Sequence, residues 1–273
     1  MGIGIRLFTP EHKGRNWMRL RSSGAFLGLL LACAASGTCA QKLPSADNAP
    51  TKRLFYIGLA LYSEAWSQND VVELAGELDG MTSYRLVPLI ASNVAAKRRD
   101  YPIADDAAIG SMVRQAANQA RPDDLVFVNI STHGGPKVLA SKIGNHAVTD
   151  LSSARIARMF APLAGRPTIM IISACYSGSL IGDLRARGHI IIIIITAARA
   201  DRSSFGCAPG NRHTLFGQAE LRAFGQKNRS LHQVYMAIVA DVSRMEHESH
   251  ETPSEPQVSV GADMTGLYDA PLF

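Results

Sequence analysis

The sequence predicts an α/β domain in which a mainly parallel sheet is covered by helices on both faces. From Lys52 onward, short apolar runs rich in β-branched residues alternate with stretches of helical periodicity. The runs are apolar at consecutive positions, as expected for strands buried on both faces of a parallel sheet. Of the 273 residues 47% are hydrophobic, and the four cysteines are too few for a disulfide scaffold. The core must therefore come from packed apolar side chains.

Five buried strands are predicted from continuous apolar runs: Leu54–Ala60, Tyr84–Ile90, Leu125–Ile130, Thr168–Ser173 and His189–Thr196. The second strand is expected to end near Pro88. The last contains six consecutive isoleucines, Ile190 to Ile195. This run suits a central strand and is too short to cross a bilayer, which takes about 20 helical residues. Weak alternation over Pro136–Thr149, around Gly144-Asn145, predicts a small hairpin.

Four helices are expected, and the first is Asp70–Leu78. The other three are recognised by their caps and by their apolar faces. The second helix is capped by Asp105 or Asp106 and directs Ile109, Met112, Val113 and Ala116 inward. The third is capped by Ser152 and directs Ile156, Met159, Phe160 and Leu163 inward. The fourth begins with a capping box of Ser230 and Gln233 and directs Val234, Ile238, Val242 and Met245 inward.

Residues 1–40 have the pattern of a secretory signal peptide. Arg19 and Arg21 precede the apolar run Ala25 to Ala35, and small residues follow. The run has about ten apolar residues, about half of what a transmembrane helix needs. Residues 41–51 are expected to form a polar tether and residues 52–273 the folded domain. The domain is therefore expected outside the cytoplasm, either periplasmic, lipid-anchored in a bacterial envelope, or secreted.

Two processing sites compete at the end of this leader. Leu30-Leu31-Ala32-Cys33 resembles a bacterial lipobox, in which Cys33 becomes a lipidated N-terminus and attaches the protein to a membrane. Thr38-Cys39-Ala40 instead offers small residues for ordinary cleavage before Gln41. The sequence leaves both open.

The net charge of +5 does not indicate nucleic-acid binding. Residues 1–40 hold five basic side chains and one acidic one, so the chain after Ala40 has a net charge of only +1. The sequence has no glycine-rich phosphate loop, and its histidines lack the spacing of metal ligands. We expect no nucleic-acid partner, no metal and no cofactor.

A histidine and a cysteine follow two of the predicted strands. Leu125–Ile130 runs into Ser131-Thr132-His133-Gly134-Gly135, and Thr168–Ile172 runs into Ser173-Ala174-Cys175-Tyr176-Ser177-Gly178. In an open parallel sheet, sites form beyond the carboxyl ends of the strands. If these strands are neighbours, His133 and Cys175 emerge side by side at one edge.

Such a pair suits acyl transfer through a thioester, followed by hydrolysis. A thiol is a poor nucleophile until a base or a local positive potential produces the thiolate, and His133 can supply the base. A helix that starts just after Cys175 would add a favourable dipole potential. Gly134 lets the backbone approach a bound carbonyl, and its N–H with that of Cys175 can hold an oxyanion.

These motifs, His-Gly after one strand and Ala-Cys-x-Ser-Gly after the next, resemble the bacterial branch of the legumain-like (asparaginyl endopeptidase) family of cysteine peptidases. The segment from Thr196 to Cys207 is similar to that family's Thr-Ala-Ala…Ser-Ser-Tyr/Phe segment. Pro253-Ser254-Glu255-Pro256-Gln257 resembles the ending of its bacterial members. The resemblance covers Asp123 to Gly261. It implies a caspase-like three-layer sandwich with a mainly parallel central sheet and helices on both faces.

The resemblance also implies roles for single residues. His133 would be the general base and later the acid for the leaving amine, Cys175 the nucleophile, and Gly134 an oxyanion donor. Ser203 and Ser204 would border the pocket for the residue before the scissile bond. Ser173 and Arg199 are further candidates for substrate binding. The substrate would be a peptide or protein.

The sequence departs from the family pattern in two places. Eukaryotic legumains have Glu before the Ala-Cys pair, where Ser173 stands. They also carry an Asn and then an Arg-His pair after the first strand, whereas Ala65 to Asp70 holds no Arg or His. Gln68 or Asn69 is therefore the candidate to orient His133. A preference for Asn at the cleavage site does not carry over.

Two alternatives stay open. A thioester can be attacked by an amine as well as by water, which would give transpeptidation. A different class is a catalytically silent cell-envelope binding or scaffold protein on the same fold, which the missing Arg-His pair favours. Cys207 is a second thiol near the pocket, half of a disulfide or, as we expect, simply buried. Arg199 with Asp201 either selects substrate charge or forms a solvated surface pair.

Overall fold

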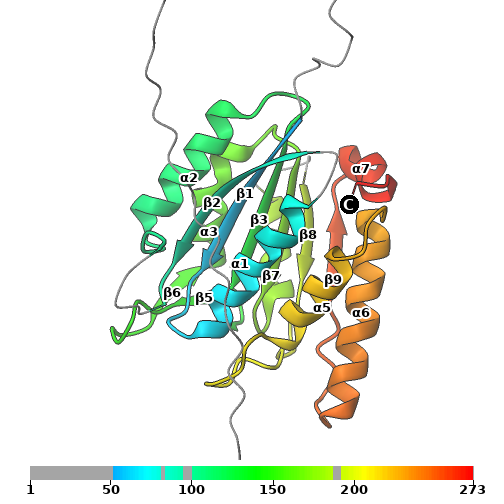
Figure 1. The fold of residues 1–273 in the computed structure, drawn as a ribbon. Coiled ribbons are helices and arrows are strands. Elements are labelled where there is room, and N and C mark those ends of the chain that lie inside the picture. The colour runs from blue at the N-terminus through cyan, green and yellow to red at the C-terminus, as the bar shows by residue number, and fades with distance from the viewer. Residues whose placement is uncertain (1–51, 81–83, 95–99, 187–191, 273) are drawn as a thin grey trace, which may run out of the picture. The chain divides into compact units, whose positions relative to one another are not determined.

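The computed structural model describes residues 52–80, 84–94, 100–186 and 192–272 (Figure 1). These residues belong to one compact unit. The predicted signal peptide, the tether and Cys33 lie outside the described residues, and so does the start of the predicted strand His189–Thr196.

A six-stranded sheet forms the centre of the fold (Figure 1). Its strands lie in the order β2 (Arg85–Ser92), β1 (Arg53–Ala60), β3 (Leu125–Ser131), β7 (Thr168–Ser173), β8 (Ile192–Thr196) and β9 (Gln257–Val260). The first five are parallel, and β9 runs antiparallel to β8. Strands β3, β7 and β8 are buried at every position, which explains their continuous apolar sequences.

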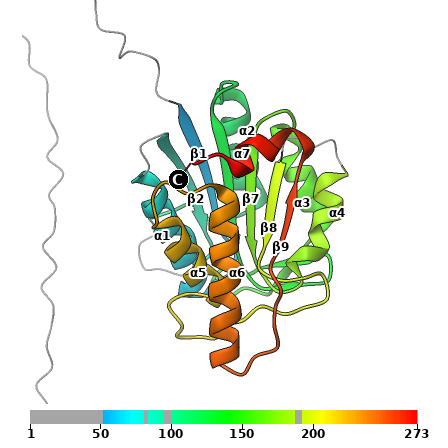
Figure 2. The same ribbon diagram turned by 90° about the vertical axis from the view of Figure 1, so that its right-hand side faces the viewer.

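Helices cover both faces of this sheet (Figure 2). Helices α1 (Ala65–Asp79), α5 (Leu215–Phe224) and α6 (Leu231–Glu248) pack on one face, and α2 (Asp106–Gln119), α3 (Ser153–Phe160) and α4 (Ile181–Arg185) on the other. Successive strand residues point to opposite faces of the sheet. Phe127 therefore packs in the hydrophobic cluster under α1, α5 and α6, and Val128 in the cluster under α2, α3 and α4. The predicted three-layer sandwich is confirmed.

A small antiparallel sheet follows β3. It consists of β4 (Gly134–Gly135), β5 (Val138–Ser141) and β6 (Thr149–Ser152). Strands β5 and β6 form the hairpin predicted around Gly144-Asn145, but β4 adds a tighter turn before it. The remaining short elements are η1 (Ala161–Leu163), η2 (Ser177–Leu180), η3 (Ala262–Met264) and α7 (Thr265–Asp269).

The predicted helix caps are present. Asp105, rather than Asp106, accepts a hydrogen bond from the first turn of α2, and Ser152 does the same for α3. Ser230 and Gln233 form the complete capping box of α6. Each cap satisfies backbone N–H groups that have no partner within the helix.

Several elements differ from the prediction, and the largest omission is helix α5, which was not among the four expected helices. Helix α1 begins at Ala65, well before Asp70, because its first turn buries Trp66. Strand β2 continues through Pro88, which is tolerated because β2 is an edge strand with one side unpaired within the sheet. Strand β9 was not expected, since its four residues are only partly buried and give no long apolar run.

Candidate active site

His133 and Cys175 follow neighbouring strands at the same edge of the central sheet. Strands β3 and β7 pair in parallel, and their register places Ser131 opposite Ser173. The pairing continues one residue further, because the Thr132 N–H donates to the Ser173 carbonyl at 3.0 Å. His133 and Cys175 each stand two residues beyond the aligned serines. The two strands are therefore neighbours, as the predicted pairing of His133 with Cys175 requires.

Gly134 packs directly against the backbone of Cys175. A Cβ atom at this position would lie 2.4 Å from the Cys175 carbonyl oxygen, so only glycine fits here without a backbone shift. Gly134 lies opposite Leu139 in the β4–β5 ladder, and the preceding residue His133 accepts a hydrogen bond from the Ala140 N–H at 2.9 Å. Because hydrogen-bonded and non-bonded pairs alternate in an antiparallel ladder, the Gly134 N–H is not used by β5.

The Cys175 thiol is free and half-buried, and its neighbour is Ser204. The Ser204 N–H donates to Sγ at 3.3 Å and its hydroxyl lies 3.8 Å from Sγ, while Sγ lies 3.3 Å from the Ser204 carbonyl oxygen. The thiol donates to the Ser204 carbonyl oxygen, so Ser204 surrounds the sulfur with two donors and one acceptor. The Cys175 N–H has no hydrogen-bond acceptor among the residues that the structure describes.

The turn after Cys175 has a constrained backbone. Tyr176 adopts the left-handed conformation (φ 57°, ψ 15°), which is uncommon for a residue other than glycine. The next glycine, Gly178, packs against the backbone at Ala198 and Ala200, with 2.8 Å from a built Cβ to the Ala200 nitrogen. These contacts fix Cys175 beside the segment that carries Ser203 and Ser204. The short η2 follows and runs directly into α4, so a helical stretch begins just after Cys175, as expected.

The imidazole of His133 packs against two neighbouring aromatic rings, which we call the aromatic clamp: Tyr62 and Trp66. Both rings contact it edge to face, with centroid distances of 4.3 Å for Tyr62 and 5.2 Å for Trp66. The Trp66 Nε1–H donates to the Glu64 carboxylate at 2.8 Å. Glu64, the residue before α1, thus holds the Trp66 ring of the clamp.

Burial lowers the pKa of His133 below its ordinary value of 6.5, and the charge of Lys142 lowers it further. The carboxylate of Glu64 acts in the opposite direction and raises the pKa of His133. Because the net pKa shift is downward, the imidazole is neutral at neutral pH and can accept a proton. Within the described residues no hydrogen bond joins His133 to Cys175, a common situation in sites that hold no substrate.

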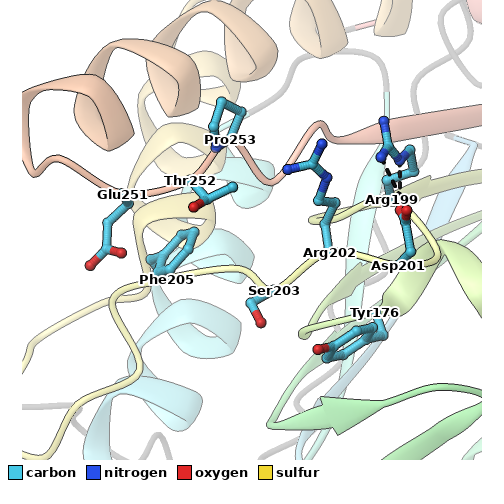
Figure 3. A pocket seen from close by; sticks show the side chains of 9 residues that line it. All are labelled: Tyr176, Arg199, Asp201, Arg202, Ser203, Phe205, Glu251, Thr252 and Pro253. Carbon is cyan, nitrogen blue, oxygen red and sulfur yellow. Dashed lines mark hydrogen bonds and ion pairs between the residues drawn. The ribbon is translucent and has the colours of Figure 1, made fainter.

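The other predicted site residues lie in different surroundings. Ser173 is fully buried, and its hydroxyl lies 3.1 Å from that of Thr214. Arg199 pairs with Asp201 and Glu255. Ser203 and Arg199 both line an open pocket, which Figure 3 shows beside Tyr176. Because Ser173 is buried, a substrate bound at the surface does not reach its hydroxyl in this arrangement, and the predicted substrate contact of Ser173 gains no support from the structure.

A buried carboxylate holds the segment after Ser204 in place. Asp70 on α1 accepts hydrogen bonds from the hydroxyls of Ser131 at 3.0 Å and Thr214 at 2.9 Å, and it pairs with His213 Nδ1 at 3.0 Å. Burial raises the pKa of Asp70 above its ordinary value, although these hydrogen bonds oppose the shift. This cluster links the end of β3 to the residues that precede α5.

Cys207 is a free, half-buried thiol on the same segment. Burial raises its pKa, with smaller upward contributions from Cys175 and Glu64. A thiol with a raised pKa reacts slowly at neutral pH, so Cys207 is an internal reference for the reactivity of Cys175.

The two candidates for orienting His133 have other partners. Gln68 accepts a hydrogen bond from the Ser92 hydroxyl at 2.6 Å, and Asn69 donates to the Arg212 carbonyl at 2.9 Å. The residues that surround His133 are Tyr62, Glu64 and Trp66, which sequence reasoning missed. A signal was present: an acidic and an aromatic residue lie just after the first strand, where the sheet edge is expected.

The residues that the structure describes hold neither a metal-binding cluster nor a membrane-spanning helix. No group of three or more histidine, cysteine, aspartate or glutamate side chains is arranged to hold a metal ion in this part of the chain. Over the same residues, no helix is both long enough and apolar enough to cross a membrane.

Comparison with known proteins gives a family and a fold. A model of the peptidase C13 family matches residues 104–266. Among solved structures, caspase-1 from Spodoptera frugiperda has a TM-score of 0.53 to this chain at 16% sequence identity, and the match covers 81% of this chain and 93% of that chain. At this identity the likeness concerns the fold. No curated protein matches the sequence.

Proposed function

The chain belongs to the peptidase C13 (legumain) family, and from this premise we propose that it is a cysteine endopeptidase with Cys175 as nucleophile and His133 as general base. A peptidase of this family acts on peptides or proteins. The proposal rests chiefly on one observation: the backbone at Gly134 touches the Cys175 carbonyl, so the segments bearing the two side chains meet at one edge of the sheet.

The first half of the reaction forms a thioester. His133 takes the proton from the Cys175 thiol, and the thiolate attacks the carbonyl carbon of the scissile peptide bond. The Gly134 and Cys175 N–H groups donate to the oxygen that becomes negatively charged, because neither is committed elsewhere among the described residues. His133 then gives its proton to the leaving amine as the carbon–nitrogen bond breaks.

The second half releases the acid product. Neutral His133 takes a proton from a water molecule, and the hydroxide attacks the thioester carbonyl. The carbon–sulfur bond breaks, the imidazolium returns its proton to the sulfur, and the free thiol is restored. An amine in place of water would give transpeptidation, so the product mixture in the presence of an added amine separates the two reactions.

Cleavage of a peptide library tests this proposal. We expect native protein to cleave at defined positions, and Cys175→Ala or His133→Ala to lower the cleavage rate by about a hundredfold or more. Circular dichroism establishes that the variants are folded. Peptide binding without any cleavage by native protein would instead favour the scaffold function.

We also propose that the protein is exported from the cytoplasm. Residues 1–40 act as an export signal, and the domain works outside the cytoplasm after release or lipid attachment. Mass spectrometry of the mature N-terminus tests both points. A lipidated Cys33 or a start at Gln41 is expected, and a mature protein that keeps residues 1–40 would contradict export.

A further inference from the structure

An open pocket of about 510 Å³ lies beside the candidate nucleophile. Figure 3 shows it between the turn at Tyr176, the segment Arg199 to Phe205, and the stretch Glu251 to Pro253 that precedes β9. Tyr176 directly follows Cys175 in the chain, and Ser203 directly precedes the residue that contacts the Cys175 sulfur. A substrate bound at Cys175 therefore passes this pocket.

The backbone at Ser203 is free to pair with such a substrate. The Tyr176 N–H donates to the Arg202 carbonyl at 2.7 Å and the Phe205 carbonyl accepts from the Leu215 N–H at 3.0 Å, which holds the segment on both sides. Neither the N–H nor the carbonyl of Ser203 is hydrogen-bonded within the described residues. An extended peptide can add to this segment as a strand, with one of its side chains directed into the pocket.

Two arginines line the pocket, and they differ in the number of carboxylate hydrogen bonds that their guanidinium groups donate. Arg199 is held by Asp201 through two hydrogen bonds, at 2.6 Å and 3.1 Å, and by the Glu255 carboxylate. Arg202 has an ion contact of 3.4 Å with Glu255 and a weaker electrostatic interaction with Asp201, and its guanidinium donates no hydrogen bond within the described residues. Its side chain is 30% exposed. The guanidinium N–H groups of Arg202 are thus available to donate to a ligand in the pocket.

The rest of the lining supplies hydroxyl groups and one opposing charge. The hydroxyls of Tyr176, Ser203 and Thr252 make no hydrogen bond within the residues that the structure describes. Glu251 is exposed and lies at the left of the pocket beside Phe205, whereas Arg202 lies between Pro253 and Arg199 (Figure 3). A planar guanidinium with free N–H groups binds a carboxylate through two parallel hydrogen bonds, and the hydroxyls can donate to the same group.

We propose that this pocket is a specificity subsite for an acidic side chain, aspartate or glutamate, on the substrate near the scissile bond, and that Arg202 binds its carboxylate. The location of the subsite depends on the proposed peptidase function. The charge preference of the pocket is independent of that function, because peptide binding can be measured on a variant that cannot cleave.

The binding test uses full-length Cys175→Ala protein and short fluorescent peptides that carry Glu, Gln or Lys at one position in turn. At one position we expect Glu to bind about tenfold more tightly than Gln, and Lys more weakly than either. Arg202→Gln in the same background should make Glu and Gln equal, and Arg202→Glu should favour Lys. Arg114→Gln on α2, which alters an exposed arginine outside the pocket, should keep the native preference.

Cleavage by protein with an intact Cys175 gives the second readout, as the ratio of kcat/KM for the Glu and Gln peptides. The preference should weaken at high salt, since the pocket is open to solvent. The proposal is overturned if Glu and Gln peptides bind equally at every position, if Lys is preferred because Glu251 dominates, or if Arg202→Gln keeps the native ratio. A protein that binds acidic peptides but cleaves none would refute the peptidase function and leave the subsite standing.

Discussion

Ser131 and Ser173 lie opposite each other as the last paired residues of β3 and β7. Both are buried, and each begins a short segment that leaves the sheet, one toward His133 and the other toward Cys175. The equal spacing brings the two functional side chains to the same edge without any contribution from a flexible loop. The register of the sheet is therefore the part of the fold on which the proposed chemistry depends.

Gly134→Ala tests whether the close approach of the two segments matters. The new Cβ would meet the Cys175 carbonyl oxygen at 2.4 Å, and a backbone atom cannot move aside as a flexible side chain can. We expect kcat/KM to fall by about tenfold or more, because the Gly134 N–H is displaced from the oxyanion position.

Gly76→Ala is the matched control for that variant. Gly76 is exposed within α1, and a Cβ there would meet no atom within 4 Å. The change should stabilise the protein by about 0.5–1 kcal/mol and leave activity unchanged. Equal activity of the two variants in peptide cleavage would show that the contact at Gly134 is unimportant.

The pH dependence of activity tests the surroundings of His133. The base must be neutral, and the pKa of His133 is lowered, so kcat/KM of native enzyme should rise with pH through a value below 6.5. Glu64→Gln keeps an acceptor for the Trp66 Nε1–H but removes the charge that raises the pKa of His133, so the acidic limb should move to lower pH.

Lys142→Gln should move the acidic limb of the same profile in the opposite direction. The Lys142 ammonium lies 5.4 Å from the centroid of the Tyr62 ring and lowers the pKa of His133. Profiles of kcat/KM against pH for the two variants form a paired test. Limbs that stay fixed, or that shift the same way, would mean that His133 is not the group that titrates.

The buried carboxyl of Asp70 gives a prediction for stability. Asp70→Asn keeps one oxygen that can accept from both hydroxyls but replaces the oxygen facing His213 with an NH₂ group, which should cost about 2 kcal/mol. The pKa of Asp70 is raised in the folded state, so its contribution to stability is fully present below 3.8 and is lost as pH rises through the folded value. The deficit of the variant should therefore shrink between acidic and neutral pH. Urea denaturation at several pH values measures it, and a deficit that grows with pH would contradict the raised pKa.

Much of this site could be predicted from sequence because strand ends are well defined. Buried parallel strands are continuous apolar runs, so the chemistry-bearing residues His133 and Cys175 are found where such runs stop. The capping residues Ser152 and Ser230 were equally recognisable, since capping depends on a few neighbouring residues.

The missed features depend on contacts between segments far apart in the sequence. Glu64 and Trp66 approach His133 because β1 and β3 are adjacent, and their position just after the first strand does not by itself show which residue they face. Asp70 looks like an ordinary helix residue until the segment containing His213 and Thr214 packs over it. Likewise, Glu255 contacts both Arg199 and Arg202 although it lies more than fifty residues away in the sequence.

Alkylation of the two described thiols tests most directly whether Cys175 and His133 act as a pair. Mass spectrometry after iodoacetamide treatment at neutral pH gives a separate rate for each cysteine. We predict that Cys175 reacts about tenfold or more faster than Cys207, and that His133→Ala abolishes the difference without unfolding the protein. Equal slow rates in native protein, or a Cys175 rate that His133→Ala leaves unchanged, would contradict the pairing of this thiol with this imidazole.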